Sequence, residues 1–251
     1  MTARPASVST LAIVNDSPAA RAVMAAVVQA AGGFRLVGQA ASGEEGVDLV
    51  RRLRPDLLLL DMHMPDINGV EVTRRVMAAH PTRILICSAT IRRNTSYLFD
   101  ALKLGALDYA RTPALKARPG ARVGRAELLE AGDALLHKMR TVLSLPPPGR
   151  DQRAGPGRET APATPTLPAA GPAALPLVAI GSSTGGPSAL ATLFSALPRE
   201  LPAAFLVSQH IDEEFSEGLA LWLGQETGHP VKVAAQGSLL YTSDAADDWR
   251  E

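Results

Sequence analysis

The chain has 251 residues, of which 46% are hydrophobic and 4% aromatic, and its 25 basic and 25 acidic side chains give a formal net charge of +0. A zero net charge provides no attraction to nucleic acid or to an anionic membrane, and no apolar run approaches the ~20 residues of a membrane-spanning helix. The N-terminus lacks the features of a signal peptide, and a single cysteine, Cys87, excludes an intrachain disulfide. These properties predict a cytoplasmic protein that binds no nucleic acid and does not insert into a membrane.

Strands and helices are expected to alternate through residues 1–145. Short apolar segments predict strands at residues 11–14, 34–40, 57–60, 83–87 and 107–110. Amphipathic segments predict helices at residues 18–31, 42–53, 70–79, 96–104 and, as one long final helix, 126–143. The four leucines at 57–60 are typical of a strand that is buried on both faces of a parallel sheet. The repeat predicts an α/β domain built on a doubly wound, five-stranded parallel sheet.

The composition changes after this domain. Residues 146–176 are rich in proline, alanine, glycine and threonine without apolar periodicity, which predicts an extended, flexible linker. A second α/β unit follows over residues 177–237. Its expected elements are a buried strand at 175–180, a helix at 188–194, a strand at 203–208 and a further possible strand at 231–235.

The last residues, 238–251, do not continue the α/β pattern. The segment 239–247 resembles the conceptual translation of a transposase-type sequencing adapter, and a natural polar tail is the alternative. We favour the first interpretation because the second unit otherwise ends after roughly 60 residues, which are few for an independent core. We therefore expect residues 177–237 to be the N-terminal part of a longer domain and the tail to be aberrant.

Polar residues follow three of the predicted strands of the first domain. Asn15 and Asp16 follow the first strand, Asp61 the third and Ser88 the fourth. We expect them to converge, because parallel strands place their carboxyl ends at one edge of the sheet. Mg²⁺ would relieve the repulsion between the two carboxylates, Asp61 would attack a phosphoryl donor to form an acyl phosphate, and Ser88 would donate a hydrogen bond to it. The alternative is that both carboxylates only cap helices or face solvent.

A second candidate site lies at the start of the second unit. Ser183 occupies a glycine-rich turn between a strand and a helix, where the backbone N–H groups of Thr184, Gly185 and Gly186 can hold an oxyanion. His210 ends the next strand, so it is expected at the same sheet edge as Ser183. This arrangement predicts a nucleophilic serine with a histidine base. A phosphate-binding loop or a plain tight turn are the alternatives for the glycine-rich segment.

The motifs around both sites carry a family resemblance. Residues 10–115 resemble a response-regulator receiver domain, on the motifs IVNDS (13–17), LDMHMPDING (60–69) and ICSA (86–89). Residues 177–237 resemble the start of the methylesterase domain of the chemotaxis protein-glutamate methylesterases, the CheB family, on IGSSTGGP (180–187) and SQH (208–210). Receiver, linker and esterase in this order are the architecture of that family.

For the first domain, the resemblance implies a phosphoacceptor, a magnesium site and two switch residues. Asp61 would be the phosphoacceptor, and Asp16, Asp61 and the backbone carbonyl of His63 would hold Mg²⁺. Ser88 and Tyr109 would be the switch residues. A chemotaxis-type histidine kinase would be the phosphoryl donor.

For the second domain, the resemblance implies hydrolysis of glutamyl methyl esters on methyl-accepting chemoreceptors, and deamidation of receptor glutamines. Ser183 would be the nucleophile and His210 the base. The family's third catalytic residue is an aspartate further along the chain, in a glycine-rich segment that this sequence lacks. The resemblance therefore implies an inactive fragment. The alternative function is a receiver-based binding or regulatory module without catalytic output.

The sequence departs from the receiver pattern at two positions. Asn15 stands where the family usually has an acid, and Thr112, before Pro113, stands where it usually has a lysine. The first change is expected to weaken Mg²⁺ binding, and the second removes an ion pair with the phosphoaspartate. Together they resemble the subclass of surface-sensing, Wsp-type systems.

Overall fold

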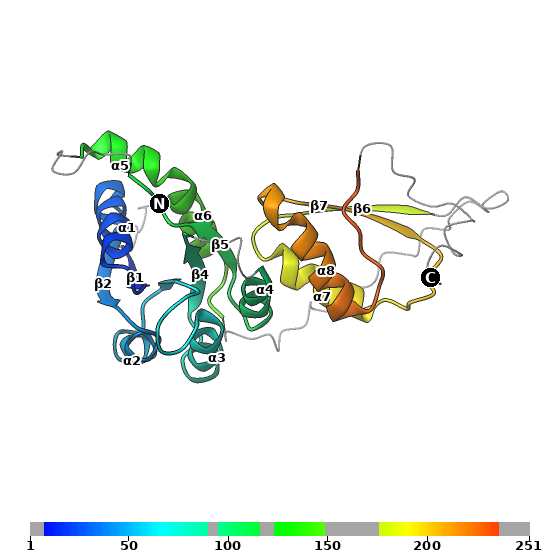
Figure 1. The fold of residues 1–251 in the computed structure, drawn as a ribbon, viewed down its shortest axis with the longest axis horizontal. Coiled ribbons are helices and arrows are strands. Elements are labelled where there is room, and N and C mark those ends of the chain that lie inside the picture. The colour runs from blue at the N-terminus through cyan, green and yellow to red at the C-terminus, as the bar shows by residue number, and fades with distance from the viewer. Residues whose placement is uncertain (1–7, 90–94, 116–122, 149–175, 236–251) are drawn as a thin grey trace, which may run out of the picture. The chain divides into compact units, whose positions relative to one another are not determined.

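The structure is a computed structural model that describes residues 8–89, 95–115, 123–148 and 176–235 (Figure 1). The chain divides into two compact units, Met1–Arg150 and Asp151–Glu251. The predicted tail falls entirely within residues 236–251, and the predicted linker within residues 149–175 except for its ends, 146–148 and 176, so the tail and most of the linker lie outside the described residues. No helix among the described residues is long and apolar enough to span a membrane.

The first unit is built on a five-stranded sheet. Its strands are β1 (Ser9–Val14), β2 (Phe34–Ala40), β3 (Leu57–Leu60), β4 (Arg83–Ser88) and β5 (Asp108–Arg111). All neighbours pair in parallel, in the order β2-β1-β3-β4-β5. The helices are α1 (Pro18–Ala31), α2 (Gly43–Leu53), α3 (Gly69–Ala79), α4 (Thr95–Lys103), α5 (Arg125–Ala131) and α6 (Asp133–Ser144). This topology confirms the predicted fold class.

Helix starts in this unit are set by short polar side chains. The side-chain oxygens of Ser17, Ser42 and Asn68 accept backbone N–H groups in the first turns of α1, α2 and α3. Each bond satisfies a donor that has no partner within its helix. Because each cap follows a strand, these three helices begin on the side of the carboxyl edge of the sheet.

One hydrophobic cluster fills the space between the sheet and helices α1 and α6, which Figure 1 shows beside it. Strand residues Ile13, Leu59 and Leu85 meet Met24 of α1 and Met139 of α6, and all five side chains are fully buried. The single thiol belongs to the same cluster, with Cys87 at 0% exposure. Every second residue of a strand points into this cluster, and the same alternation of side chains continues to the end of the strand at the sheet edge.

The predicted long helix at 126–143 is wrong in one respect, because α5 and α6 are separate helices that meet at Gly132. The backbone there leaves the helical region (φ −96°, ψ 0°). A β-carbon at this position would overlap the side chain of Val27 on α1 and lie 3.1 Å from the carbonyl oxygen of Leu128. The close approach to α1 explains the break, and periodicity along one helix carries no information about it.

The second unit contains two parallel strands, β6 (Leu177–Ser182) and β7 (Ala204–Gln209), with helices α7 (Gly186–Ala196) and α8 (Ser216–Thr227) and a 3-10 turn at Glu213–Phe215. The buried strand expected at 175–180 is wrong in its burial, since Leu177 and Val178 are 53% and 40% exposed. The strand expected at 231–235 does not form, because these residues pair with no strand of the described chain. Alternating apolar residues favour extended backbone, but a strand also needs a hydrogen-bonded neighbour.

We expect Gly132→Ala to lower the free energy of unfolding by about 1–3 kcal/mol, because the new methyl group must displace Val27. Urea unfolding of the full chain, followed by far-UV circular dichroism, measures this change. Gly124→Ala is the matched control, since a β-carbon at Gly124 meets nothing within 4 Å. Its effect should stay at about 0.5 kcal/mol, because Gly124 is the N-cap of α5 and alanine is less favoured there. Equal effects of the two substitutions would contradict the packing explanation.

Candidate functional site

The acidic site of the first unit forms where β1 and β3 end side by side. The backbone N–H of Asp61 donates to the carbonyl oxygen of Val14, the last residue of β1, at 2.8 Å, which continues the ladder one residue past the end of β3. The Asp61 side chain is 9% exposed, and its Oδ1 accepts the Met62 N–H at 2.7 Å. Burial raises the pKa of Asp61, the hydrogen bonds from Met62 and His63 oppose that shift, and the nearby charge of Asp16 adds to it.

The loop after β1 is held by its own polar groups. The Oδ1 of Asn15 accepts the Ser17 N–H at 2.8 Å, so Asn15 forms a tight turn in addition to its place at the sheet edge. The Arg21 guanidinium donates to the carbonyl oxygens of Asn15 and Asp16 at 2.6 and 3.1 Å. These bonds fix the backbone that presents the exposed Asp16 carboxylate. Arg21 was not predicted, and only its position one turn into α1 could have indicated it.

The groups expected to hold Mg²⁺ are all oxygen donors, namely the carboxylates of Asp16 and Asp61 and the backbone carbonyl of His63. Mg²⁺ typically binds through one or two carboxylates and keeps several waters, so the residues present fit this ion. No cluster of three or more His, Cys, Asp or Glu side chains suited to a metal occurs in the described parts of the chain. The donor set therefore does not favour a metal that needs three or four side-chain ligands.

The loop that follows Asp61 is tied to α2. The carboxylate of Asp66 accepts the N–H groups of Gly43 and Glu44 at 2.8 and 2.9 Å, which are orphan donors of the α2 N-terminus. Desolvation opposes the effect, but the hydrogen bonds from Glu44 and Gly43 hold the pKa of Asp66 well below its usual range. Sequence reasoning missed this contact because it joins residues 22 and 23 positions apart.

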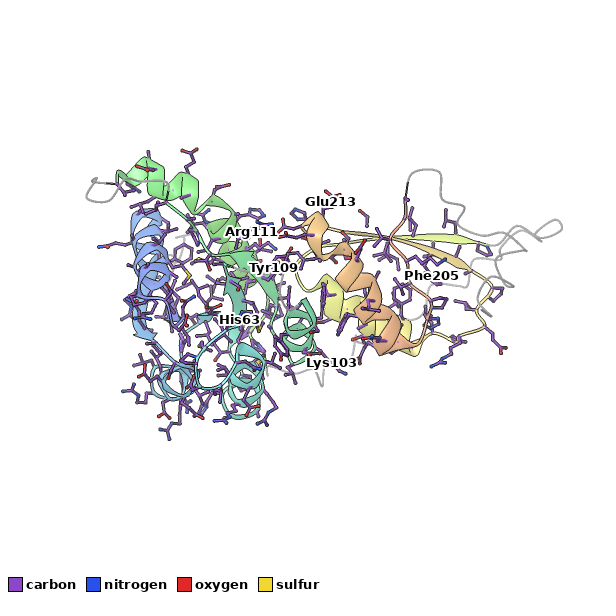
Figure 2. The ribbon with its side chains drawn as sticks, in the orientation of Figure 1. His63, Lys103, Tyr109, Arg111, Phe205 and Glu213 are labelled. Carbon is purple, nitrogen blue, oxygen red and sulfur yellow. The ribbon has the colours of Figure 1, made fainter. Side chains whose placement is uncertain are left out.

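Of the predicted switch residues, Ser88 is the last residue of β4, whereas Tyr109 lies within β5, opposite Ile86 of β4. Ser88 is 5% exposed and Tyr109 is 6% exposed. Figure 2 shows Tyr109 on β5, and the Nζ of Lys138 lies 4.4 Å from its ring centroid and 2.9 Å from Oδ1 of Asp108. Lys138 comes from α6 and was not predicted. Helical periodicity places it on a face but cannot show which strand residue it meets.

Thr112 continues the ladder beyond β5, since its N–H donates to the carbonyl oxygen of Ser88 at 3.2 Å. Its hydroxyl is buried and has no hydrogen-bond partner among the described residues. Thr112 therefore lies at the sheet edge with Ser88 but provides no positive charge there.

In the second unit, Ser183 and His210 meet at the carboxyl edge of the two strands. The ladder ends with Ser182 opposite Gln209, and the His210 N–H donates to the Ser182 carbonyl oxygen at 2.9 Å. Ser183 Oγ then lies 3.4 Å from Nδ1 of His210, and both residues are exposed. A proton can pass from the hydroxyl to Nδ1 when that nitrogen is unprotonated.

The turn after Ser183 provides fewer oxyanion donors than expected. Gly185 has a φ of 76°, a left-handed conformation that glycine adopts without strain, and its N–H has no acceptor among the described residues. The prediction for Gly186 is wrong in this conformation, because its N–H donates to the Ser183 carbonyl oxygen at 2.8 Å. Gly185 and Thr184 remain the predicted donors. Among the described residues, no carboxylate forms a hydrogen bond with the His210 ring.

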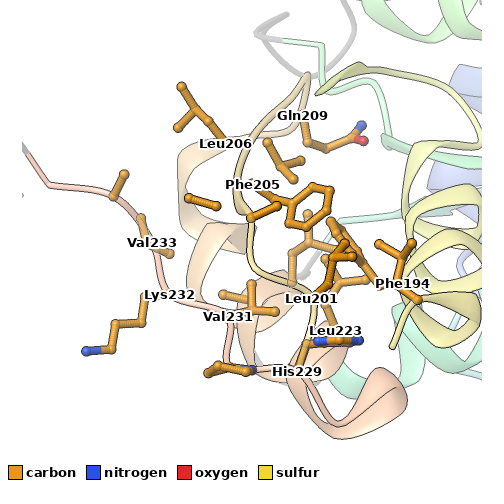
Figure 3. Close-up of a pocket in the computed structure, with 18 of the residues that line it drawn as sticks. Phe194, Leu201, Phe205, Leu206, Gln209, Leu223, His229, Val231, Lys232 and Val233 are labelled. Carbon is orange, nitrogen blue, oxygen red and sulfur yellow. The ribbon is translucent and has the colours of Figure 1, made fainter. Parts of the chain in front are cut away.

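A pocket of about 840 Å³ lies beside this pair in the second unit (Figure 3). Its walls include Phe194, Phe205 and Leu223, and it extends to residues 230–234. Neither Ser183 nor His210 lines it. The reactive pair therefore lies on an exposed sheet edge and not within this cavity.

The strand order β2-β1-β3-β4-β5 is that of the flavodoxin-like α/β proteins, a class that includes the receiver domains of signalling proteins. The family model for the response regulator receiver domain matches residues 11–117, and the model for CheB methylesterase matches residues 178–245. These two matches, receiver before methylesterase, make the chain similar to the CheB-type protein-glutamate methylesterases.

Two curated relatives and one solved structure illustrate what the chain is similar to. Protein-glutamate methylesterase/protein-glutamine glutaminase 2 of Burkholderia lata is 38% identical over 231 residues, which cover 91% of this chain and 62% of that protein. The corresponding protein 1 of Cupriavidus pinatubonensis is 40% identical, over 90% of this chain and 61% of that protein. The response regulator domain of Thermotoga maritima CheB covers 56% of this chain and 99% of that chain, with 27% identity and a TM-score of 0.46. The chain thus spans about three fifths of the length of these curated relatives.

The raised pKa of Asp61 has a consequence for stability. The folded chain binds the Asp61 proton more tightly than the unfolded chain does, so the ionised carboxylate lowers the free energy of unfolding at neutral pH. We expect Asp61→Asn to raise the free energy of unfolding at pH 7. The advantage should shrink as the pH falls toward the ordinary aspartate pKa of about 3.9.

Urea unfolding at a series of pH values, without divalent cations, measures this dependence. Asp48→Asn is the matched control, because the Asp48 side chain is 62% exposed in a surface ion pair with Arg51. That substitution should change stability by no more than about 0.5 kcal/mol. If Asp61→Asn instead lowers the free energy of unfolding at pH 7, the cost of burying the Asp61 charge is not the dominant effect on stability.

Proposed function

We propose that this chain is the regulatory and nucleophile-bearing part of a phosphorylation-regulated protein-glutamate methylesterase of a two-component chemosensory pathway in the cytoplasm. Its substrates would be glutamyl methyl esters, and also glutamines, of methyl-accepting chemoreceptors. The observation that carries the proposal is the 3.4 Å approach of Ser183 Oγ to His210 Nδ1, in a chain that also carries a receiver domain. The names of the relatives, protein-glutamate methylesterase/protein-glutamine glutaminase, support the same reaction.

In the proposed reaction, Ser183 Oγ attacks the ester carbonyl carbon while His210 takes the hydroxyl proton. The Gly185 N–H stabilises the resulting oxyanion. His210 returns the proton to the methoxy group, methanol leaves, and water then hydrolyses the acyl-enzyme by the same steps. The 3.4 Å contact is longer than a typical O–H···N hydrogen bond and is expected to shorten when substrate binds. Because Ser183 and His210 are both exposed, they are accessible to a substrate side chain on the surface of another protein.

In the proposed control step, Asp61 accepts a phosphoryl group from a chemotaxis-type histidine kinase. Asp16, Asp61 and the His63 carbonyl would hold Mg²⁺, which neutralises charge on the phosphoryl oxygens. Ser88 would donate to one of those oxygens, and Tyr109 would move with it. The Asn15 amide would weaken the ion's binding, and with Thr112 it supports a place in the Wsp-type subclass.

The second candidate function is a binding or regulatory module without catalytic output. The absence of a carboxylate bonded to the His210 ring, within the described residues, supports it. A histidine without such a partner is a weaker base, because nothing orients its ring or stabilises the imidazolium. We therefore propose that residues 1–251 alone hydrolyse receptor esters slowly or not at all.

Phosphorylation of the receiver is tested with acetyl phosphate as the donor. We expect the full chain to gain one phosphoryl group at Asp61, detected by intact mass, only when Mg²⁺ is present. Asp61→Asn should abolish the modification, since the amide cannot form an acyl phosphate. Asp48→Asn, on the surface of α2, should behave as the wild type. Equal modification of the wild type and Asp61→Asn would contradict the assignment of the phosphoacceptor.

The serine nucleophile is tested with a fluorophosphonate probe. Ser183 Oγ forms a bond to phosphorus, fluoride leaves, and His210 takes the proton, so the test needs no receptor. We expect Ser183→Ala to abolish labelling and His210→Gln to slow it by about 10²–10⁴-fold. Thr192→Val, which removes another exposed hydroxyl on α7, should leave the rate unchanged. Labelling of Ser183→Ala at the wild-type rate would remove the hydrolase proposal.

A further inference from the structure

The side-chain amide of Gln209 joins the two segments that carry Ser183 and His210. Its Oε1 accepts the Ser182 hydroxyl at 2.6 Å, and its Nε2 donates to the carbonyl oxygens of Ser183 and His210 at 2.9 and 3.2 Å. One side chain at the end of β7 therefore contacts the residue before the predicted nucleophile, the nucleophile itself and the predicted base.

The orientation of this amide is fixed by its partners. Both carbonyl oxygens can only accept hydrogen bonds, so the nitrogen must face them, and the hydroxyl of Ser182 is then the donor to Oε1. The opposite orientation would place Oε1 against two carbonyl oxygens. All three bonds are made by one part-buried group, so the amide has one favourable position.

The turn leaves room for this amide at one specific glycine. A β-carbon on Gly186 would overlap Oε1 of Gln209 and lie 3.0 Å from Cβ of Ser182. The glycine at position 186 is thus required to leave space for the Gln209 amide, independently of any role of the Gly186 N–H. The glycine-rich turn and Gln209 form one packed arrangement.

Backbone pairing alone does not set the geometry of the reactive pair. The ladder ends with Ser182 opposite Gln209, and the His210 N–H bond to Ser182 is the last backbone contact between the strands. Beyond that point, the Gln209 amide is what holds the peptide units of Ser183 and His210 to each other. We infer that Gln209 is a positioning residue for the Ser183–His210 pair, an inference that rests on the proposed hydrolase function.

The inference is tested by the kinetics of fluorophosphonate labelling of the full chain, resolved into the maximal rate, kinact, and the concentration for half-maximal rate, KI. Gln209→Met fills a similar volume without hydrogen bonds and should lower kinact by roughly 10–100-fold, with little change in KI. Gln209→Glu should lower kinact further, because a carboxylate oxygen would face two carbonyl oxygens. A residue that only packs would give the wild-type kinact with Met.

The matched controls are Gln225→Met and Gln225→Glu, on an exposed position of α8, which should keep the wild-type kinact and KI. Ser182→Ala removes only the hydroxyl that donates to Oε1, and its kinact should lie between those of the wild type and Gln209→Met. This variant tests the inference if the Gln209 variants fail to fold. Gly186→Ala, with Gln209 intact, should also lower kinact by displacing the amide.

The outcomes separate the two proposals. If the wild type labels and both Gln209→Met and Ser182→Ala keep its kinact, the positioning inference is wrong and the hydrolase proposal stands. A rise in KI at constant kinact also overturns the inference, since it would indicate a role in probe binding. If the wild-type Ser183 does not react at all, the hydrolase proposal fails and the inference fails with it.

Discussion

Parallel strand pairing is the constraint on which both candidate sites depend. In each unit, a backbone hydrogen bond extends the ladder one residue past one strand, from Asp61 to Val14 at the end of β1 and from His210 to Ser182 at the end of β6. The residue that donates this bond is the one with the predicted chemistry. A parallel sheet brings such residues together from distant parts of the sequence, and it does so at one edge only. The positions of Asp61 and His210 are therefore consequences of strand order and register.

The acidic site differs in its charged residues from the receiver domains that the first unit resembles. Asn15 removes one negative charge that receivers usually carry there, and Thr112 removes one positive charge, so the sum is unchanged. Both neutral residues are held by the backbone, Asn15 through the Ser17 N–H and Thr112 through the Ser88 carbonyl. Burial of Asp61 near Asp16 still costs stability, and Arg21 orders the Asp16 backbone without forming an ion pair in the described contacts. The site retains its carboxylates at the expense of stability.

Local sequence patterns predicted the five strands of the first unit, their order of alternation with helices, and the approach of Ser183 to His210. Periodicity, caps and turn residues act within a few positions, so they carry this information. They could not predict the break at Gly132, the exposure of β6 or the unpaired residues 231–235, which depend on neighbours distant in sequence. The contacts of Asp66, Lys138 and Gln209 were missed for the same reason. Gly186 is the one local signal that could have indicated Gln209, because two consecutive glycines often mark a place where another group lies close to the backbone.

The buried thiol of the first unit has a practical consequence. Burial, with a smaller contribution from the Asp61 charge, raises the pKa of Cys87 well above its ordinary value. The reactive thiolate is therefore scarce, and the sulfur is shielded from oxidants and alkylating reagents. Because Cys87 is the single cysteine of the sequence, one thiol introduced on the surface would be modified selectively. Spectroscopic reporters can thus be attached to either unit without removing the native cysteine.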